Sequence, residues 1–419
     1  MVRQESAKLL YASSILAQAS AHKSDRLQCP GGEIGIRSRL KICRLHRLAG
    51  SSPAPGTYMK SEKNINSPTF FVGVRGNGII SFGSGQPDLP PPEQIYKILP
   101  QYHAFKYGLI QGQENLRTAL ATHYPKAHAD DFVITNGASE ALDLTFRALA
   151  LLVGKGRVLL PRPYYYSYPM LVKLAGLQPV FTDLNTEGRI DIKDFKKKIK
   201  GCKAVLINSP SNPTGKVEDI ATLKEIEKIT NQLDIHLLSD EVYKDLIYER
   251  KNYLLRGPKV VTINSFSKTY AMCGLRVGYL YSRDRQLVDR VIDIKGKTSM
   301  NTSIISQEMA YAATQVPMRQ LESQISVWRE RRDLICNGLK KMGLELWKPE
   351  GAFYVFPKIQ KANQVVNELF YKHKVIVYDG AWFGSPDRIR LSYALDVKDI
   401  REGLARIRKY ISARPELLK

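Results

Sequence analysis

The sequence lacks any long apolar run and any closely spaced pair of cysteines. No stretch of about 18 consecutive apolar residues occurs in the chain, so no transmembrane helix is predicted. The five cysteines are odd in number and scattered, and none forms a Cys-x-x-Cys pair, which argues against a zinc site and a disulfide framework. This usage favours a reducing compartment. We therefore expect no metal and a cytoplasmic location.

Acidic residues are few beside basic ones. The 40 Asp and Glu face 63 Lys and Arg, which gives a formal net charge of +23. Such a charge suits nucleic acid or a membrane surface, but equally small anions such as carboxylates and phosphates. The charge is spread along the whole chain, and no basic-plus-aromatic repeat indicates stacking on bases. We expect small anionic ligands, and neither nucleic acid nor a membrane as a partner.

Residues 1–58 differ from the rest, with nine Lys/Arg, three acids and little apolar periodicity. This composition is typical of a disordered extension, of misassigned gene start, or of an organellar transit segment, which ranks behind the other two. We expect these residues to lie outside the fold. A regulator that binds DNA through them is the least favoured interpretation, because no recognisable reading helix is present.

Short apolar runs alternate with helical periodicity over residues 96–296. Strands are predicted at residues 132–135, 157–161, 178–184, 204–208, 236–240, 260–265 and 275–281. Helices are predicted up to about residue 124 and at residues 139–152, 168–175, 192–198 and 220–232. The alternation predicts a large α/β domain with a mostly parallel sheet sandwiched by helices, in which ligands bind at the carboxyl ends of the strands.

The pattern changes after about residue 297. Helices are predicted at residues 303–314, 320–342 and 397–412, and strands at residues 344–349, 351–357, 374–378 and 388–393. We interpret residues 297–419 as a smaller α+β domain. Residues 59–95 are expected to pack with it.

The stretch Ser265–Leu280 concentrates reactive and anion-binding side chains. The amine of Lys268 can form a Schiff base with an aldehyde once burial or a cationic neighbour favours its neutral form. Ser265, Ser267 and Arg276 suit a phosphate, which arginine grips with two parallel bonds. An aldehyde and a phosphate on one small molecule describe pyridoxal 5′-phosphate (PLP). A surface lysine beside a glycine turn is the competing interpretation.

Two turns after strands offer further groups to a ligand. Gly137 permits a tight turn, and the amides of Ala138 and Ser139 open a helix whose N-terminus attracts anions. Asn212, in the loop NSPSNPTG at the same sheet edge, offers both a donor and an acceptor. Each turn also has a plain structural interpretation, without a ligand.

Polar and aromatic side chains elsewhere extend the set. Asp240 follows an apolar run and, once buried, needs a partner such as a protonated pyridine nitrogen. Tyr243 can donate to a ring oxygen, and Tyr165 can stack on a planar ring. Arg390 can clamp a carboxylate. Helix capping by Asp240, core packing by Tyr165 and a surface position for Arg390 are the alternatives.

Taken together, nine motifs resemble the class I/II PLP-dependent aminotransferases of fold type I, the aspartate-aminotransferase-like family. They are SGQPD, YGLIQG…LR, NGASEAL, PRPYYYSYP, NSPSNPTG, SDEVY, SFSKTY…GLRVGY, PEGAFY and RIRLSYA. They follow one another in unbroken order over about residues 68–412. Each motif alone is weak or moderate, but nine in one order leave little room for coincidence.

The resemblance implies roles for these residues. Lys268 would carry the cofactor and move the substrate proton, with Asp240 and Tyr243 as the other catalytic residues. Gly85, Asn212 and Arg390 would bind the substrate. Tyr107 matches a tyrosine that reaches the phosphate of the neighbouring subunit, which implies a homodimer with shared active sites. The implied cofactor-binding residues are Gly137, Ala138, Ser139, Tyr165, Asn212, Asp240, Tyr243, Ser265, Ser267, Lys268, Arg276 and Tyr107.

The implied function is transfer of an amino group from an L-amino acid to a 2-oxo acid such as 2-oxoglutarate, through a Schiff base at Lys268. A C–S β-lyase or a decarboxylase on the same fold is the alternative, and a PLP-sensing regulator is less favoured. One aspartate-specific subgroup has a lysine where Ser139 stands, so the resemblance does not imply specificity for aspartate. Tyr165 replaces the tryptophan of several relatives.

Overall fold

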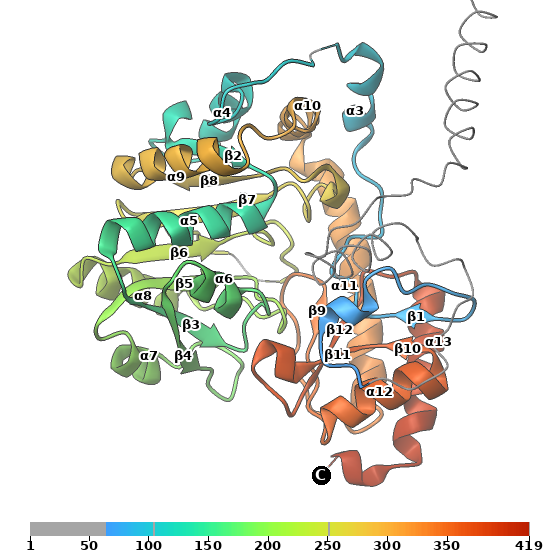
Figure 1. Ribbon diagram of the computed structural model, residues 1–419. Coiled ribbons are helices and arrows are strands. Elements are labelled where there is room, and N and C mark those ends of the chain that lie inside the picture. Colours follow the sequence, from blue (N-terminus) through green and yellow to red (C-terminus); the bar gives the residue numbers. More distant parts are fainter. Residues whose placement is uncertain (1–63, 104, 250–251, 419) are drawn as a thin grey trace, which may run out of the picture. The chain divides into compact units, whose positions relative to one another are not determined.

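The computed structural model describes residues 64–103, 105–249 and 252–418 (Figure 1). The expectations for residues 1–58 lie outside this range. Within it, every helix is too short or too polar to cross a membrane.

A seven-stranded sheet organises the larger part of the described chain. Its strand order is β2-β8-β7-β6-β5-β3-β4. Neighbouring strands are parallel except where β8 pairs with β2 and with β7, so the predicted mostly parallel sheet is confirmed. The strands are β2 (Phe132–Thr135), β3 (Arg157–Arg162), β4 (Gln178–Asp183), β5 (Cys202–Asn208), β6 (His236–Asp240), β7 (Val260–Ser265) and β8 (Gly278–Ser282).

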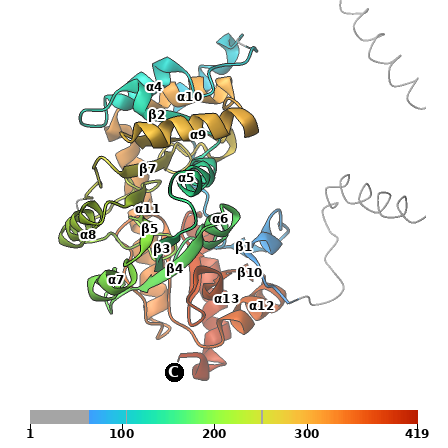
Figure 2. The same ribbon diagram turned by 60° about the vertical axis from the view of Figure 1, so that its left-hand side comes forward.

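Helices cover both faces of this sheet, as predicted. Successive strand residues point to opposite faces, so Val158 and Leu160 pack with α5, α6 and α9, while Leu159 packs with α7 and α8. Figure 2 shows α7 and α8 on the other side of the sheet from α5 and α6. The helices of this part are α3 (Glu93–Tyr96), α4 (Glu114–Ala121), α5 (Ala138–Val153), α6 (Tyr168–Leu174), α7 (Ile192–Lys198), α8 (Ile220–Gln232), α9 (Arg285–Thr298) and α10 (Ile304–Thr314).

The direction of β8 and the presence of α9 were not predicted. An apolar run carries no information about strand direction, and β8 returns antiparallel after only a short connection from β7. The strand begins at Gly278 rather than near residue 275, because Cys273–Leu275 form a 3₁₀ turn and Arg276 has a left-handed backbone with φ 52°. Helix α9 begins after Asp284, whose side chain accepts a hydrogen bond from the Leu287 amide at 3.2 Å.

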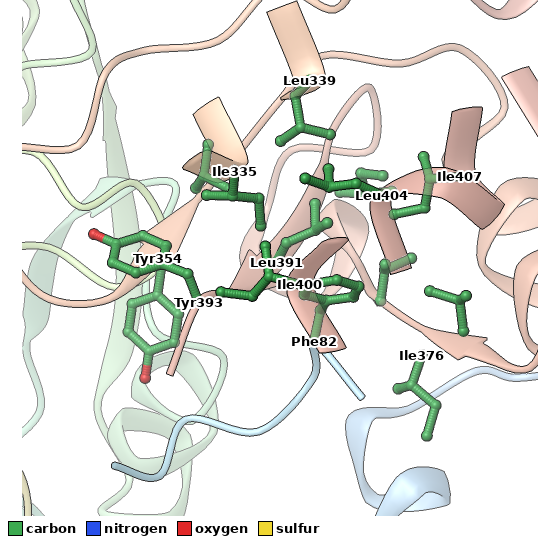
Figure 3. Packing of buried hydrophobic residues seen from close by; sticks show 14 of the residues in the cluster. Phe82, Ile335, Leu339, Tyr354, Ile376, Leu391, Tyr393, Ile400, Leu404 and Ile407 are labelled. Carbon is green, nitrogen blue, oxygen red and sulfur yellow. The ribbon is translucent and has the colours of Figure 1, made fainter. Parts of the chain in front are cut away.

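The C-terminal part builds small sheets and three long helices around a separate core (Figure 3). β9, β12 and β11 form an antiparallel sheet, and β10 pairs in parallel with β1. The elements are β1 (Ile80–Ser81), β9 (Tyr354–Val355), β10 (Val375–Ile376), β11 (Tyr378–Asp379), β12 (Ile389–Ser392), α11 (Met318–Lys340), α12 (Ala362–His373) and α13 (Val397–Ser412).

The strand predicted at residues 344–349 is wrong, because no strand forms there. Pro349 has no N–H for a ladder, and the Trp347 ring lies over the Arg388 guanidinium, 3.7 Å from its central carbon. Of the strand predicted at residues 351–357, only Tyr354–Val355 forms.

Phe82 joins the N-terminal segment to the core of the C-terminal part. Its ring packs against α13, where a Cβ added at Gly403 would lie 2.3 Å from a ring carbon. Its carbonyl oxygen accepts a hydrogen bond from the Ser392 amide at 2.7 Å. Figure 3 shows Phe82 beside Ile400 of the same helix. The domain division at residue 297 stays a prediction.

We expect Gly403→Ala to lower the stability of the protein. Alanine favours a helix by about 1 kcal/mol over glycine, but the new methyl group must displace the Phe82 ring, which costs roughly 1–3 kcal/mol. Gly296→Ala in α9 is the matched control, because the nearest atom to its added Cβ is 3.8 Å away. Chemical unfolding measures both midpoints. A midpoint for Gly403→Ala at or above that of Gly296→Ala would contradict the packing described.

Candidate active site

The carboxyl ends of three adjacent parallel strands border a cavity of about 330 Å³. β5 ends at Asn208, β6 at Asp240 and β7 at Ser265, and Asn208 pairs in register with Asp240. The sequence-predicted residues that line the cavity are Gly85, Ala138, Ser139, Tyr165, Asn212, Asp240, Tyr243, Ser265, Ser267, Lys268, Arg276 and Arg390. The structure thus brings together motifs that are far apart in the chain.

Lys268 follows β7 in the chain and lines this cavity. Its Nζ donates a hydrogen bond to the Gly85 carbonyl oxygen at 2.5 Å. It also lies 6.0 Å from the ring centroids of Tyr243 and Phe353. A neutral carbonyl and two aromatic rings therefore hold the amine in the cavity, ready for a reactive partner.

Asp240 is a buried carboxylate at the end of β6. Oδ2 accepts a hydrogen bond from the Tyr168 hydroxyl at 2.6 Å, and Oδ1 accepts one from the Val242 amide at 3.2 Å. Burial raises the pKa of Asp240 to about 6, although these two hydrogen bonds and the charge of Lys268 act in the opposite direction. A cationic ligand group would restore the charged form.

The loop after β5 and the residues after β6 form a hydrogen-bonded wall. Asn208 donates from Nδ2 to the Asp240 carbonyl at 3.0 Å and accepts from the Asn212 amide at 2.8 Å. The hydroxyls of Tyr243 and Tyr354 share a hydrogen bond of 2.8 Å. Burial raises the pKa of Tyr243 well above its usual value, so the phenol stays neutral and can donate.

Arg390 is a buried guanidinium that binds only neutral oxygens among the described residues. Nη1 donates to Asn212 Oδ1 at 3.0 Å, and Nη2 donates to the Gly83 carbonyl at 2.6 Å. Nε has no hydrogen-bond partner in the described part of the chain. The rings of Tyr354 and Tyr378 lie 4.6 and 4.7 Å from its central carbon. A buried cation of this kind suits an incoming carboxylate.

The turn before α5 can hold an anion. Gly137 has φ 79°, and no side chain in the described part of the chain caps the helix that follows. Arg276 lies beside this turn: its Nη2 donates to the Asn136 carbonyl at 3.3 Å, and a Cβ added at Gly137 would lie 2.4 Å from the same nitrogen. Uncapped amides and a guanidinium are the groups that bind phosphate at a helix N-terminus.

Two predicted residues do not line the cavity. Gly137 adjoins it through the turn. Tyr107 lies outside it, with 83% of its surface exposed. Tyr107 therefore does not reach the cavity of its own chain, and its predicted role depends on a second subunit.

Sequence reasoning missed three residues that organise the site. Tyr168 holds Asp240, Asn208 holds both Asp240 and Asn212, and Tyr354 links Tyr243 to Arg390. All three stood in motifs quoted above, Tyr354 as the last residue of PEGAFY, and a buried aspartate requires a donor nearby. The pairing of Tyr354 with Tyr243 has no signal in the sequence, because 111 positions separate them.

The side chains present fit PLP. The cavity combines a reactive amine, a buried acid for a ring nitrogen, neutral phenol and amide groups for a ring hydroxyl, and an anion cradle. No group of three or more His, Cys, Asp or Glu that could hold a metal occurs in the described ranges.

Comparisons with known proteins agree with this geometry. Residues 77–407 match the family described as aminotransferase class I and II. A probable aspartate aminotransferase of Methanocaldococcus jannaschii is 33% identical over 79% of this chain and 92% of its own.

Solved structures are similarly close. An aspartate aminotransferase of Thermotoga maritima superposes with a TM-score of 0.77 at 29% identity, covering 82% of this chain and 95% of its own. An aromatic aminotransferase of Pyrococcus horikoshii gives a TM-score of 0.76 at 28% identity, covering 83% of this chain and all of its own, 100%.

We expect Asp240→Asn to stabilise the ligand-free protein above pH 6. The folded pKa of about 6 exceeds the usual 3.8, so wild-type stability falls as pH rises between these values and stays lower above them. Removing this penalty gains on the order of 3 kcal/mol, since asparagine can still accept from Val242 and donate to Tyr168.

Thermal unfolding of the cofactor-free proteins at pH 4 and pH 8 tests this. The advantage of Asp240→Asn should be present at pH 8 and shrink toward pH 4. A variant that is less stable than wild type at pH 8 contradicts the buried-charge interpretation.

Proposed function

The chain belongs to the class I and II aminotransferases, a PLP-dependent family, and on that premise we propose that it transfers the amino group of an L-α-amino acid to a 2-oxo acid such as 2-oxoglutarate. The single observation that supports this class of substrate is the environment of Arg390. Among the described residues, this buried guanidinium has an Nε without a hydrogen-bond partner and bonds only to neutral oxygens, so it suits the α-carboxylate that both substrates share.

In this proposal the cavity residues would hold the cofactor at four places. Asp240 pairs with the ring nitrogen, and Tyr168 keeps its carboxylate in place at 2.6 Å. Tyr243 and Asn212 would bind the ring hydroxyl, and Tyr165 would stack on the ring. Ala138, Ser139, Ser265, Ser267 and Arg276, around the start of α5, would hold the phosphate.

Lys268 carries the chemistry supplied by this chain. Bound PLP supplies an electron sink. Lys268 would hold the cofactor through its Nζ, and its free amine would take the proton from the substrate Cα. Positioned proton transfer of this kind contributes roughly 10²–10⁴-fold to the rate. The Gly85 carbonyl, 2.5 Å from Nζ, orients the amine.

The donor is proposed only as an α-amino acid. The similar proteins are named for aspartate and for aromatic amino acids. The cationic side chains that line the described cavity are Lys268, Arg276 and Arg390. In this proposal they bind the cofactor aldehyde, the cofactor phosphate and the substrate α-carboxylate, respectively. Ser139 offers no charge for a second carboxylate, so specificity for aspartate is not part of the proposal.

We also propose a homodimer with shared sites. Tyr107 is exposed, as are its neighbours Phe105 and Leu109. Contiguous apolar side chains on a surface mark a contact site, and a second copy that covers them would bring Tyr107 to the partner's phosphate. The cytoplasmic location stays a prediction.

We expect Arg390→Lys to lower kcat/KM for α-amino acids by about 10²–10⁴-fold. Lysine keeps the charge but loses the two-pronged fork, which amounts to one or two charge-assisted hydrogen bonds. The half-reaction is followed by the absorbance of the bound cofactor, with formation of the 2-oxo acid as the product assay.

A primary amine without a carboxylate is the control substrate, because Arg390 has no group to bind on it. Its slow half-reaction should change little. An equal loss for the amine and the amino acid would sink the proposed carboxylate role.

Shared sites predict complementation between two impaired variants. In a mixed dimer of Lys268→Ala and Tyr107→Phe chains, one site has both defects and the other has neither. Co-expression should therefore recover about a quarter of wild-type activity, at a cofactor concentration that saturates wild type but not Tyr107→Phe. No recovery, or a monomer in analytical ultracentrifugation, contradicts the shared site.

A further inference from the structure

An ion pair between a buried lysine and a partly buried glutamate lies next to the turn that opens α5. The side chain of Lys295, on α9, is fully buried, and its Nζ donates to Glu140 Oε2 at 3.0 Å. Lys295 also donates to Ser299 Oγ at 3.3 Å. The pair joins two helices that pack side by side on one face of the sheet (Figure 1).

Glu140 extends this contact to the turn itself. Oε2 accepts a hydrogen bond from the Asn136 amide at 2.6 Å, and Oε1 accepts one from Asn136 Nδ2 at 3.1 Å. The Asn136 carbonyl in turn accepts from Arg276 Nη2 at 3.3 Å. One chain of polar contacts therefore runs from Lys295 through Glu140 and Asn136 to Arg276.

The negative charge of Glu140 is unfavourable for an anion site at this helix end. Glu140 lies in the first turn of α5, where a carboxylate competes with a bound phosphate for the positive helix end. Burial alone would raise the pKa of Glu140, but hydrogen bonds and the charge of Lys295 outweigh burial and lower this pKa below its usual value. The carboxylate is therefore ionised, and Lys295 is the one cation among the described residues that pairs with it.

We propose that Glu140 and Lys295 are positioning residues for the cofactor phosphate. Glu140 fixes the Asn136–Gly137 turn in the shape that exposes the first amides of α5. Lys295 cancels the charge of Glu140, so that the turn stays attractive to a dianion. The inference rests on the proposed phosphate site and assigns the device that keeps this site both rigid and positive.

Comparison of PLP with pyridoxal, which lacks the phosphate, tests the proposal. Full-length protein is freed of cofactor and titrated with each compound by absorbance. Lys295→Met leaves the Glu140 carboxylate uncompensated, so PLP affinity should fall about 10- to 100-fold relative to that of pyridoxal. The double variant Glu140→Gln/Lys295→Met is neutral and keeps an acceptor for Asn136, so its PLP-to-pyridoxal ratio should return to within about threefold of wild type.

Lys216→Met is the matched control, because Lys216 is also buried and pairs with Glu350 at 3.2 Å, outside the cavity. It should lower the unfolding midpoint without changing the ratio. If Lys295→Met does not fold, Glu140→Asp serves instead: it keeps the charge balance but is too short to reach both Lys295 and Asn136, and should lower the ratio.

Three outcomes separate the possibilities. A selective loss in Lys295→Met that the double variant restores supports the proposal. Equal losses for PLP and pyridoxal, or no recovery in the double variant, overturn it and leave the phosphate site standing. A wild-type protein that binds both compounds equally contradicts the phosphate site itself.

Discussion

A charge buried without an opposite charge is costly in a protein, and the cavity contains two such groups. Asp240 has neutral donors around it, and Arg390 has neutral acceptors. Neither meets an opposite charge in the described chain at hydrogen-bonding distance. The cavity therefore favours a cationic ring nitrogen beside Asp240 and a carboxylate beside Arg390. The ligands of an aminotransferase supply both groups.

The surrounding structure keeps these two charges apart and in place. Asn212 connects the two regions: its side-chain oxygen accepts from Arg390, and its amide donates to Asn208, which in turn donates to the main-chain carbonyl of Asp240. Tyr354 adds a second link, with its hydroxyl on Tyr243 and its ring over Arg390. The residues after β6 and the C-terminal part thus meet through hydrogen bonds and through apolar packing, since Tyr243 also packs against the Phe353 ring.

The sequence was informative wherever a polar residue follows an apolar strand. Asp240, Asn212 and Lys268 could be grouped in advance because parallel strands align their carboxyl ends, and register then places them in one cavity. Tyr354 could not be grouped with them, since its contact with Tyr243 depends on how the C-terminal part docks. The strand expected at residues 344–349 does not form for a related reason. The Trp347 side chain in this segment packs against Arg388, and the alternation of apolar residues does not show whether a segment packs in this way or pairs with a strand.

The backbone of residues 82–85 has a consequence for how ligands communicate. Phe82 anchors this stretch to α13, and its next carbonyls bind Arg390 from Gly83 and Lys268 from Gly85. A ligand that draws Lys268 away releases one carbonyl, and a carboxylate that draws Arg390 away releases the other. Three peptide units therefore contact groups at both ends of the cavity, and the first ligand to bind would change the hydrogen bonds that the second one meets. Such a coupling between the two ligands would run through the main chain, because both acceptors are backbone carbonyl oxygens.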